Sequence, residues 1–150
     1  MNVELSENSE LKVKIRLDFK GQARPGRFLF GGKPVDKVAE EIREQQVALF
    51  RNVPVQGVHI EDIEMSADVY TVWDELNNSE AAFAPVLLTV TAENMVDLLS
   101  FVAREEFRKI EVIEPVHQYL TKYDMERLMF KMHEEFRNYS NRMERKYSSR

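Results

Sequence analysis

The amino-acid sequence predicts an α+β fold: a ferredoxin-like βαββαβ sandwich with an additional long C-terminal helix. Three patterns carry this prediction. Apolar and polar residues alternate strictly over residues 11–19, as in a half-buried strand. Residues 86–115 show a strand pattern, a helix pattern and a second strand pattern, and residues 121–147 form an amphipathic segment without Gly or Pro. We expect one domain over residues 1–150, with a polar lead over residues 1–10.

The first strand is predicted over residues 11–19. Side chains alternate between the two faces of a strand, so one set is expected in the core and the other in water. The apolar set is Leu11, Val13, Ile15, Leu17 and Phe19, and the polar set is Lys12, Lys14, Arg16 and Asp18.

A helix is predicted next, from Pro34, which suits a first helical turn, to about Phe50. Its apolar stripe consists of Val35, Val38, Ala39, Ile42, Gln46 and Leu49. An alternating strand pattern begins at Val58 and changes parity at Glu61-Asp62, which predicts a β-bulge or a break there. Residues 74–79 are expected to form a turn.

Residues 86–115 predict a strand-helix-strand unit. The run Val86–Val90 is the first strand, and Thr91 is expected to cap the helix that follows. The right-handed crossover would place both strands parallel in one sheet. The expected helix stripe is Met95, Leu98, Leu99 and Val102, with Arg104, Arg108 and Lys109 near the helix end and Ile110–Ile113 as the second strand.

The C-terminal helix carries a seam of large apolar residues spaced 4, 3, 4, 3 and 4 apart, as in a heptad repeat. This Met seam consists of Met125, Met129, Met132, Phe136, Tyr139 and Met143. Two interpretations are open: residues 125–136 pack on the open face of the sheet, or the seam pairs with the same helix of a second copy. A heterologous partner helix is a further candidate, because methionine adapts to varied surfaces.

A basic, glycine-rich segment precedes the first helix and is a candidate site for a small anion, since helix N-termini favour negative charge. Its candidate ligand-binding residues are Arg24, Arg27, Gly31, Gly32 and Lys33. The alternative is a Gly-Pro turn with solvated basic residues. The spacing does not match a P-loop, and Pro34 stands where Ser or Thr would hold magnesium.

The sequence favours a non-enzymatic regulatory or interaction module that acts as a homodimer through its C-terminal helix. The chain has no cysteine, and we find no metal-binding or nucleophile motif, so no cofactor or metal is expected. One alternative is a cofactorless enzyme with Asp, Glu or His acid-base groups in a cleft between sheet and helices. Another is nucleic-acid binding through Lys12, Lys14 and Arg16, which the net charge of −5 disfavours.

No apolar run is long enough to cross a membrane, so no membrane partner is expected. The N-terminus is acidic and polar, unlike a signal peptide. Together with the lack of cysteine, this predicts a cytoplasmic protein.

Overall fold

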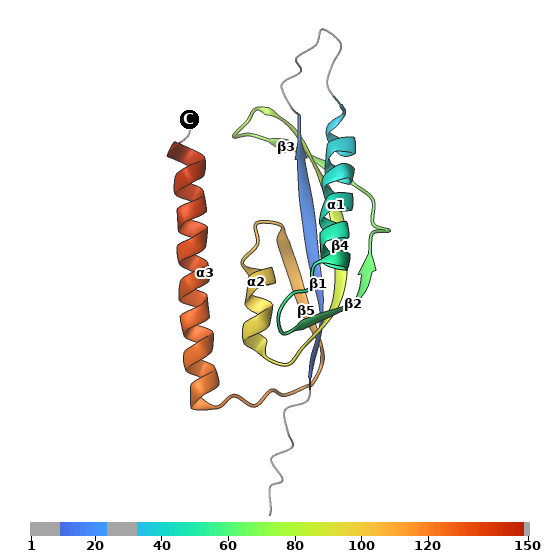
Figure 1. Ribbon diagram of the computed structural model, residues 1–150. Coiled ribbons are helices and arrows are strands. Elements are labelled where there is room, and N and C mark those ends of the chain that lie inside the picture. The colour runs from blue at the N-terminus through green and yellow to red at the C-terminus, as the bar shows by residue number, and fades with distance from the viewer. Residues whose placement is uncertain (1–9, 24–32, 149–150) are drawn as a thin grey trace, which may run out of the picture.

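The computed structural model describes residues 10–23 and 33–148, which form a mixed α+β fold (Figure 1). Its antiparallel sheet has the strand order β2-β4-β1-β5, and β3 also pairs with β4. The strands are β1 (Leu11–Gln22), β2 (Val58–Glu64), β3 (Tyr70–Asp74), β4 (Ser79–Ala92) and β5 (Phe107–Glu114). The helices are α1 (Val35–Asn52), the 3₁₀ helix η1 (Met95–Leu98), α2 (Leu99–Val102) and α3 (Lys122–Ser148).

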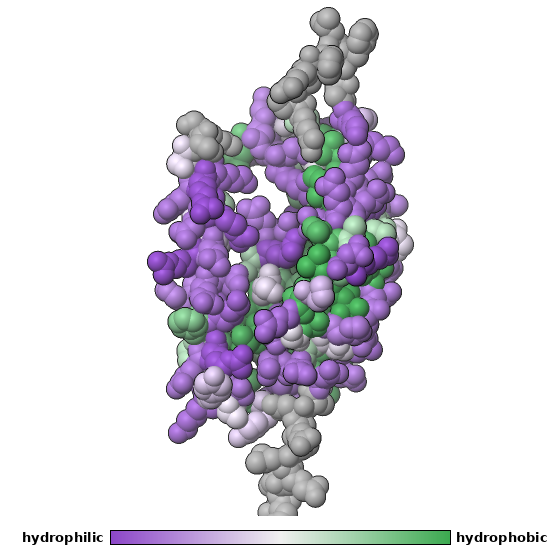
Figure 2. Space-filling model, in the orientation of Figure 1, coloured by the Kyte–Doolittle hydropathy of each residue, from purple (hydrophilic) through white to green (hydrophobic). Residues whose placement is uncertain are grey.

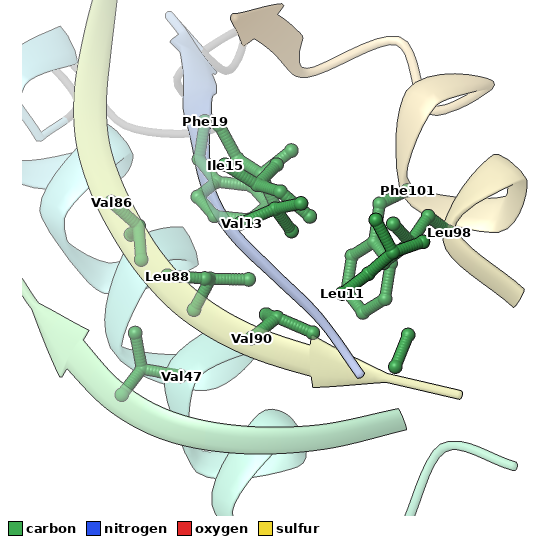
Figure 3. Close-up of a cluster of buried hydrophobic side chains, with 12 residues drawn as sticks. Leu11, Val13, Ile15, Phe19, Val47, Val86, Leu88, Val90, Leu98 and Phe101 are labelled. Atoms are coloured by element: carbon green, nitrogen blue, oxygen red, sulfur yellow. The ribbon is translucent and has the colours of Figure 1, made fainter. Parts of the chain in front are cut away.

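The core lies on one face of the sheet, where side chains of β1 and β4 pack against those of α1, η1 and α2 (Figure 3). The alternation predicted for the first strand is confirmed, and the strand continues to Gln22. Apolar side chains of β1 and β4 meet Val47 of α1, Leu98 of η1 and Phe101 of α2. The largest fully buried side chains of the strands on this face are those of Val13, Ile15, Leu17, Phe19, Val86, Leu88 and Val90. These side chains hold the short η1–α2 segment against the sheet.

The N-terminal half of α1 approaches the sheet closely because the facing residues are small. Ala39 of α1 packs with Ala82 and Ala84 of β4, and all three are fully buried. Gly21 of β1 lies directly under Ala39, where even a Cβ atom would overlap the helix backbone. The predicted stripe of α1 needs one correction: Leu49 is exposed, and Val47 takes its place in the core. Helix and sheet therefore meet here through backbone and methyl groups.

Strand β4 begins seven residues earlier than the predicted Val86, and Pro85 lies in its middle. A proline cannot donate to a ladder, but the pairing explains why it is tolerated here. The partner of Pro85 on β1 is Asp18, whose N–H donates to Glu106 O on the opposite side. In an antiparallel ladder the Pro85 nitrogen then also points away from β1, into the gap between β2 and β3. The Arg43 side chain donates from α1 to Pro85 O at 3.2 Å and satisfies that carbonyl.

The strand predicted from Val58 consists of two short strands, β2 and β3, which pair with successive parts of β4. The predicted irregularity at Glu61-Asp62 is confirmed, because the register of β2 against β4 shifts between Ile60 and Asp62. The predicted turn is also present. Its Asp74 carboxylate accepts hydrogen bonds from Leu76 N at 3.1 Å and from Lys20 Nζ of β1 at 2.9 Å.

The Asp74 carboxylate should stabilise the fold in a pH-dependent way. Hydrogen bonds from Lys20 and Asn77 hold its pKa well below the ordinary value. A carboxyl whose folded pKa is depressed stabilises the fold above its unfolded pKa of about 3.9, and this contribution disappears as the pH falls further. We expect the free energy of unfolding of Asp74→Asn to fall less steeply than that of the wild type as the pH drops below about 4. Urea unfolding midpoints of both proteins at pH 2–7 would test this. An equal decrease of the midpoint with falling pH in both proteins would contradict it.

The segment after β4 differs from its prediction. The expected long helix is only η1 followed by α2, Thr91 belongs to β4, and Arg108 and Lys109 belong to β5. The ladder explains the difference, since Ala92 is paired with both Leu11 and Val58, which keeps the chain extended past Thr91. Strands β4 and β5 are parallel as predicted, but β1 lies between them.

Helix α3 lies outside η1 and α2, on the far side of them from the sheet (Figure 1). A reciprocal pair of hydrogen bonds starts the helix: Asp124 N donates to Thr121 Oγ1, and Thr121 N donates to Asp124 Oδ2, both at 3.1 Å. The interpretation in which residues 125–136 cover the open face of the sheet is wrong, because α3 packs on η1 and α2. Among the described residues, no helix is long and apolar enough to cross a membrane.

Candidate functional site

An apolar groove with a volume of about 400 Å³ lies between α2 and α3. One wall comes from the α2 segment and the other from the middle of α3. The lining residues are Leu99, Val102, Ala103, Arg104, Met132, Glu135, Phe136 and Tyr139. Three of these, Met132, Phe136 and Tyr139, belong to the predicted Met seam. Part of the Met seam therefore forms one wall of the groove, and the α2 segment forms the other.

The C-terminal half of α3 stands away from the body. The space-filling view shows an opening beside it and mostly hydrophilic side chains on its visible surface (Figure 2). Arg142 Nη2 donates a 3.2 Å hydrogen bond to Ala103 O, just after α2, and the same guanidinium lies over the Tyr139 ring. This contact fixes the distance between the two helices without filling the space between them.

Most of the Met seam is accessible to water in the single chain. No residue of α3 is buried, and Met129 and Phe136 are 62% and 66% exposed. Met125, Met132 and Tyr139 are also exposed, and Met143 is half-buried. An apolar stripe that the chain's own fold leaves uncovered is typical of an interaction surface.

A second cluster lies on the face of the sheet that α1, η1 and α2 do not cover. Its centre is Asp18, which is 2% exposed although it points away from the core. The Asp18 carboxylate accepts hydrogen bonds from Arg16 Nε at 2.9 Å, Arg16 Nη2 at 3.1 Å and Tyr70 Oη at 2.5 Å. Arg108 Nε of β5 lies 3.6 Å from Asp18 Oδ2 and its guanidinium stacks over Phe83. Three strands thus contribute to one polar cluster around a buried carboxylate.

Tyr70 is the hydroxyl donor of the Asp18 cluster. Burial, and then the hydrogen bond to the Asp18 carboxylate, raises the pKa of Tyr70 above its ordinary value. Because even an ordinary phenol is neutral at pH 7, Tyr70 donates to Asp18 at that pH. Sequence reasoning missed this cluster, because Asp18 reads as one more water-facing residue of an alternating strand. The signal available was a single acid among Lys12, Lys14 and Arg16 on that face.

The predicted anion site falls largely outside the described residues. Arg24, Arg27, Gly31 and Gly32 lie there, so their role stays a prediction. Lys33 is described, and its Nζ forms an exposed ion pair with Glu41 Oε1 at 2.6 Å. This pair partly neutralises the positive charge that Lys33 would offer to an anion.

Two basic residues of β1, Lys12 and Arg16, are paired with carboxylates. Lys12 forms an ion pair with Glu61 of β2 at 3.3 Å, and Arg16 binds Asp18. Paired cations release fewer counterions on binding a phosphate backbone, so this face offers less to a nucleic acid than the sequence suggests. Aromatic rings are present on the same face, because Tyr70 of β3 stacks on Phe83 of β4.

The described residues hold no group of three or more His, Asp or Glu side chains placed to share a metal ion. Of the titratable side chains, the α2–α3 groove contains Arg104, Glu135 and Tyr139, and no histidine or aspartate. Arg104 is engaged elsewhere, donating to Gln46 Oε1 at 3.1 Å and lying over Phe19 and Phe50. The arrangement in the groove suits burial of an apolar partner better than acid-base chemistry.

A scan against models of known protein families, and searches of curated proteins and of solved structures, found no match to this chain. Its function is therefore inferred from its own geometry.

Proposed function

We propose that this protein is a non-enzymatic interaction or regulatory module that forms a homodimer by pairing α3 with α3 of a second copy. The observation that carries the proposal is the exposed Met seam along a helix of 27 residues. Burying such a stripe removes apolar surface from water, which is the main driving force of association. The lack of cysteine suits a reducing compartment such as the cytoplasm.

The spacing of the Met seam favours a second copy as the occupant. The spacings 4, 3, 4, 3 and 4 read the same in both directions, with their centre at Glu134. In an antiparallel two-fold pair centred there, every seam residue would face another seam residue. The facing pairs would be Met125 with Met143, Met129 with Tyr139, and Met132 with Phe136. A two-fold interface requires this kind of self-complementarity.

The groove beside the seam supplies the remaining contact area. Helix α3 is about 40 Å long at ~1.5 Å per residue and about 10 Å wide. One such face alone is small against the roughly 800 Å² that each partner buries in a standard stable interface. Leu99 and Val102 of α2 form the opposite wall of the groove. A partner helix seated on the seam would contact them as well, which enlarges the interface.

We also propose that the fold is ferredoxin-like, with η1–α2 as a shortened second helix. The supporting observation is the sheet order β2-β4-β1-β5, in which β1 separates the parallel strands β4 and β5. In a βαββαβ chain of this type, each crossover skips one strand in this way. The helix layer on one face and the uncovered other face agree with that arrangement.

Charged substitutions on the seam test the dimer. We expect the double variant Met129→Glu/Phe136→Glu to be a folded monomer, because a pair would have to bury four like charges without partners. We expect the matched control Phe130→Glu to remain dimeric, since Phe130 is similarly exposed but lies beside the seam. Light scattering at about 100 µM would measure the masses and circular dichroism the folding. A monomeric wild-type chain would contradict the proposal and leave a heterologous helix as the candidate partner.

Cysteine cross-linking tests the relative orientation of the two α3 helices in the dimer, since the native chain has no cysteine. In the antiparallel pair, the double variant Met129→Cys/Tyr139→Cys should form intermolecular disulfides efficiently, while each single variant should not. In a parallel pair, each single variant would cross-link with itself. Efficient cross-linking of both single variants would therefore overturn the antiparallel register.

A further inference from the structure

A small hollow on the uncovered face of the sheet lies far in the fold from the Met seam. It occurs where β2 has ended and β3 has not yet begun, so that part of β4 has no strand beside it. Its volume is about 170 Å³, and it is lined by Arg16, Glu64, Ala67, Pro85, Val86 and Leu87. At ~30 Å³ per water molecule, this is the space of roughly six waters, which suits only a small ligand.

The strand register places opposite charges on the two sides of this hollow. Leu87 of β4 is paired with Arg16 of β1 on one side and with Glu64 of β2 on the other. Directly paired residues point to the same face of a sheet, so all three side chains rise from the uncovered face. Two strand spacings separate the charged residues, which puts their Cα atoms about 10 Å apart. The floor between them is apolar and consists of Leu87 and Pro85.

Both charged side chains are held in place by other groups. Asp18 binds Arg16 through Nε and Nη2, which leaves Nη1 outside this pair. Ser66 Oγ donates to Glu64 Oε1 at 2.7 Å, which leaves Oε2 outside that bond. Among the described residues, no ion pair within 4.0 Å joins Arg16 to Glu64. A guanidinium and a carboxylate therefore line the hollow on opposite sides of an apolar floor, each with one polar atom outside these bonds.

We propose that this hollow binds a free α-amino acid with a small apolar side chain. The ligand's carboxylate would accept hydrogen bonds from Arg16, and its ammonium group would donate to Glu64. Its side chain would lie on Pro85 and Leu87. A molecule with only one of the two charges would bind to only one of these two side chains, so the site favours zwitterions. This inference does not depend on the dimer, because α3 packs on η1 and α2 over the other face.

The test is a calorimetric titration of the full chain at pH 7 with L-alanine, L-valine and L-leucine. We expect at least one to bind, and its analogues lacking the amine or the carboxylate (3-methylbutanoate and isobutylamine for valine) to bind at least tenfold more weakly. Arg16→Gln and Glu64→Gln should each weaken binding at least tenfold. Arg108→Gln is the control, because Arg108 also contacts Asp18 but does not line the hollow. We expect this variant to bind the amino acid as tightly as the wild type does.

Three results would overturn the proposal. The first is the absence of heat for all three amino acids at concentrations up to about 10 mM, which corresponds to a binding free energy weaker than about −3 kcal/mol. The second is that 3-methylbutanoate or isobutylamine binds as tightly as valine. This would mean that the site does not require both charges on the ligand. The third is unchanged affinity in Glu64→Gln, whose exposed position makes misfolding an unsuitable explanation.

Discussion

Replacing Gly21 with valine should destabilise the protein by about 3 kcal/mol, near the upper end of the usual range for overpacked sites. The reason is the contact between β1 and α1. A Cβ atom at Gly21 would overlap the backbone N of Ala39 and lie 2.7 Å from both Ala39 Cα and Val35 O. These are helix backbone atoms, so no side-chain rotation relieves the overlap. At about 2–4 °C per kcal/mol for a chain of this size, the melting temperature should fall by roughly 10 °C.

Two comparisons separate this effect from the general cost of changing a glycine. Gly57→Ala should cost only about 1 kcal/mol, for its positive φ, because the new Cβ would meet the flexible side chain of Asp97. Gly21→Ala should already cost about 2 kcal/mol, and adding Ala39→Gly should not rescue it, since the close atoms are backbone. Thermal unfolding of the wild type, Gly57→Ala, Gly21→Ala and Gly21→Ala/Ala39→Gly would measure these changes in stability. Rescue by Ala39→Gly would contradict the backbone contact.

The same contact shows why part of this fold could be predicted and part could not. Residues 11–19 were predictable because strict alternation reports which side chains face the core, and the core residues Val13 to Phe19 follow it. The close approach at Gly21 depends on where α1 crosses β1, which no local pattern records. The same holds for the choice of Val47 over Leu49 in the core of α1. Local periodicity gives the face of an element, but tertiary contacts set its exact rotation.

Long-range pairing also explains the errors around β4. Proline is normally excluded from inner strands, so a strand beginning after Pro85 was the reasonable prediction. Pro85 is tolerated because β2 and β3 leave a gap beside it, and the position of that gap follows from the register of three strands. Thr91 is a good helix cap by its chemistry, yet pairing on both sides of β4 keeps it in the strand. In both cases a neighbour distant in sequence decides the conformation.

The same distinction between local patterns and long-range contacts applies to the candidate sites. The Met seam was predictable, because a heptad pattern within one helix needs only sequence spacing. Its position beside α2 was not, since that depends on how the chain returns after β5. The Asp18 cluster and the Arg16–Glu64 hollow join residues from two or more strands, so they exist only once the register is known. Sites within one element can be predicted from sequence, whereas sites between elements require the fold.

Removing the Asp18 carboxylate should be the second large perturbation. We expect Asp18→Ala to destabilise the fold by about 3 kcal/mol, at the lower end for breaking a buried ion pair, because Arg16 and Arg108 keep part of their contact with water. The loss would leave two guanidinium groups close together and the Tyr70 hydroxyl without its acceptor. Asp62→Ala is the matched control, since it removes an exposed carboxylate from β2 and should change stability by less than about 0.5 kcal/mol.

A double-mutant cycle with Tyr70→Phe identifies how this stabilisation arises. Tyr70→Phe alone should cost about 2 kcal/mol, the range for a hydrogen bond to a charged group. In the Asp18→Ala background the same change should cost close to nothing, because the hydroxyl has already lost its acceptor. Urea unfolding of the four proteins gives the coupling energy. Additive effects would mean that Tyr70 and Asp18 stabilise the sheet independently, and the short hydrogen bond between them would then contribute little.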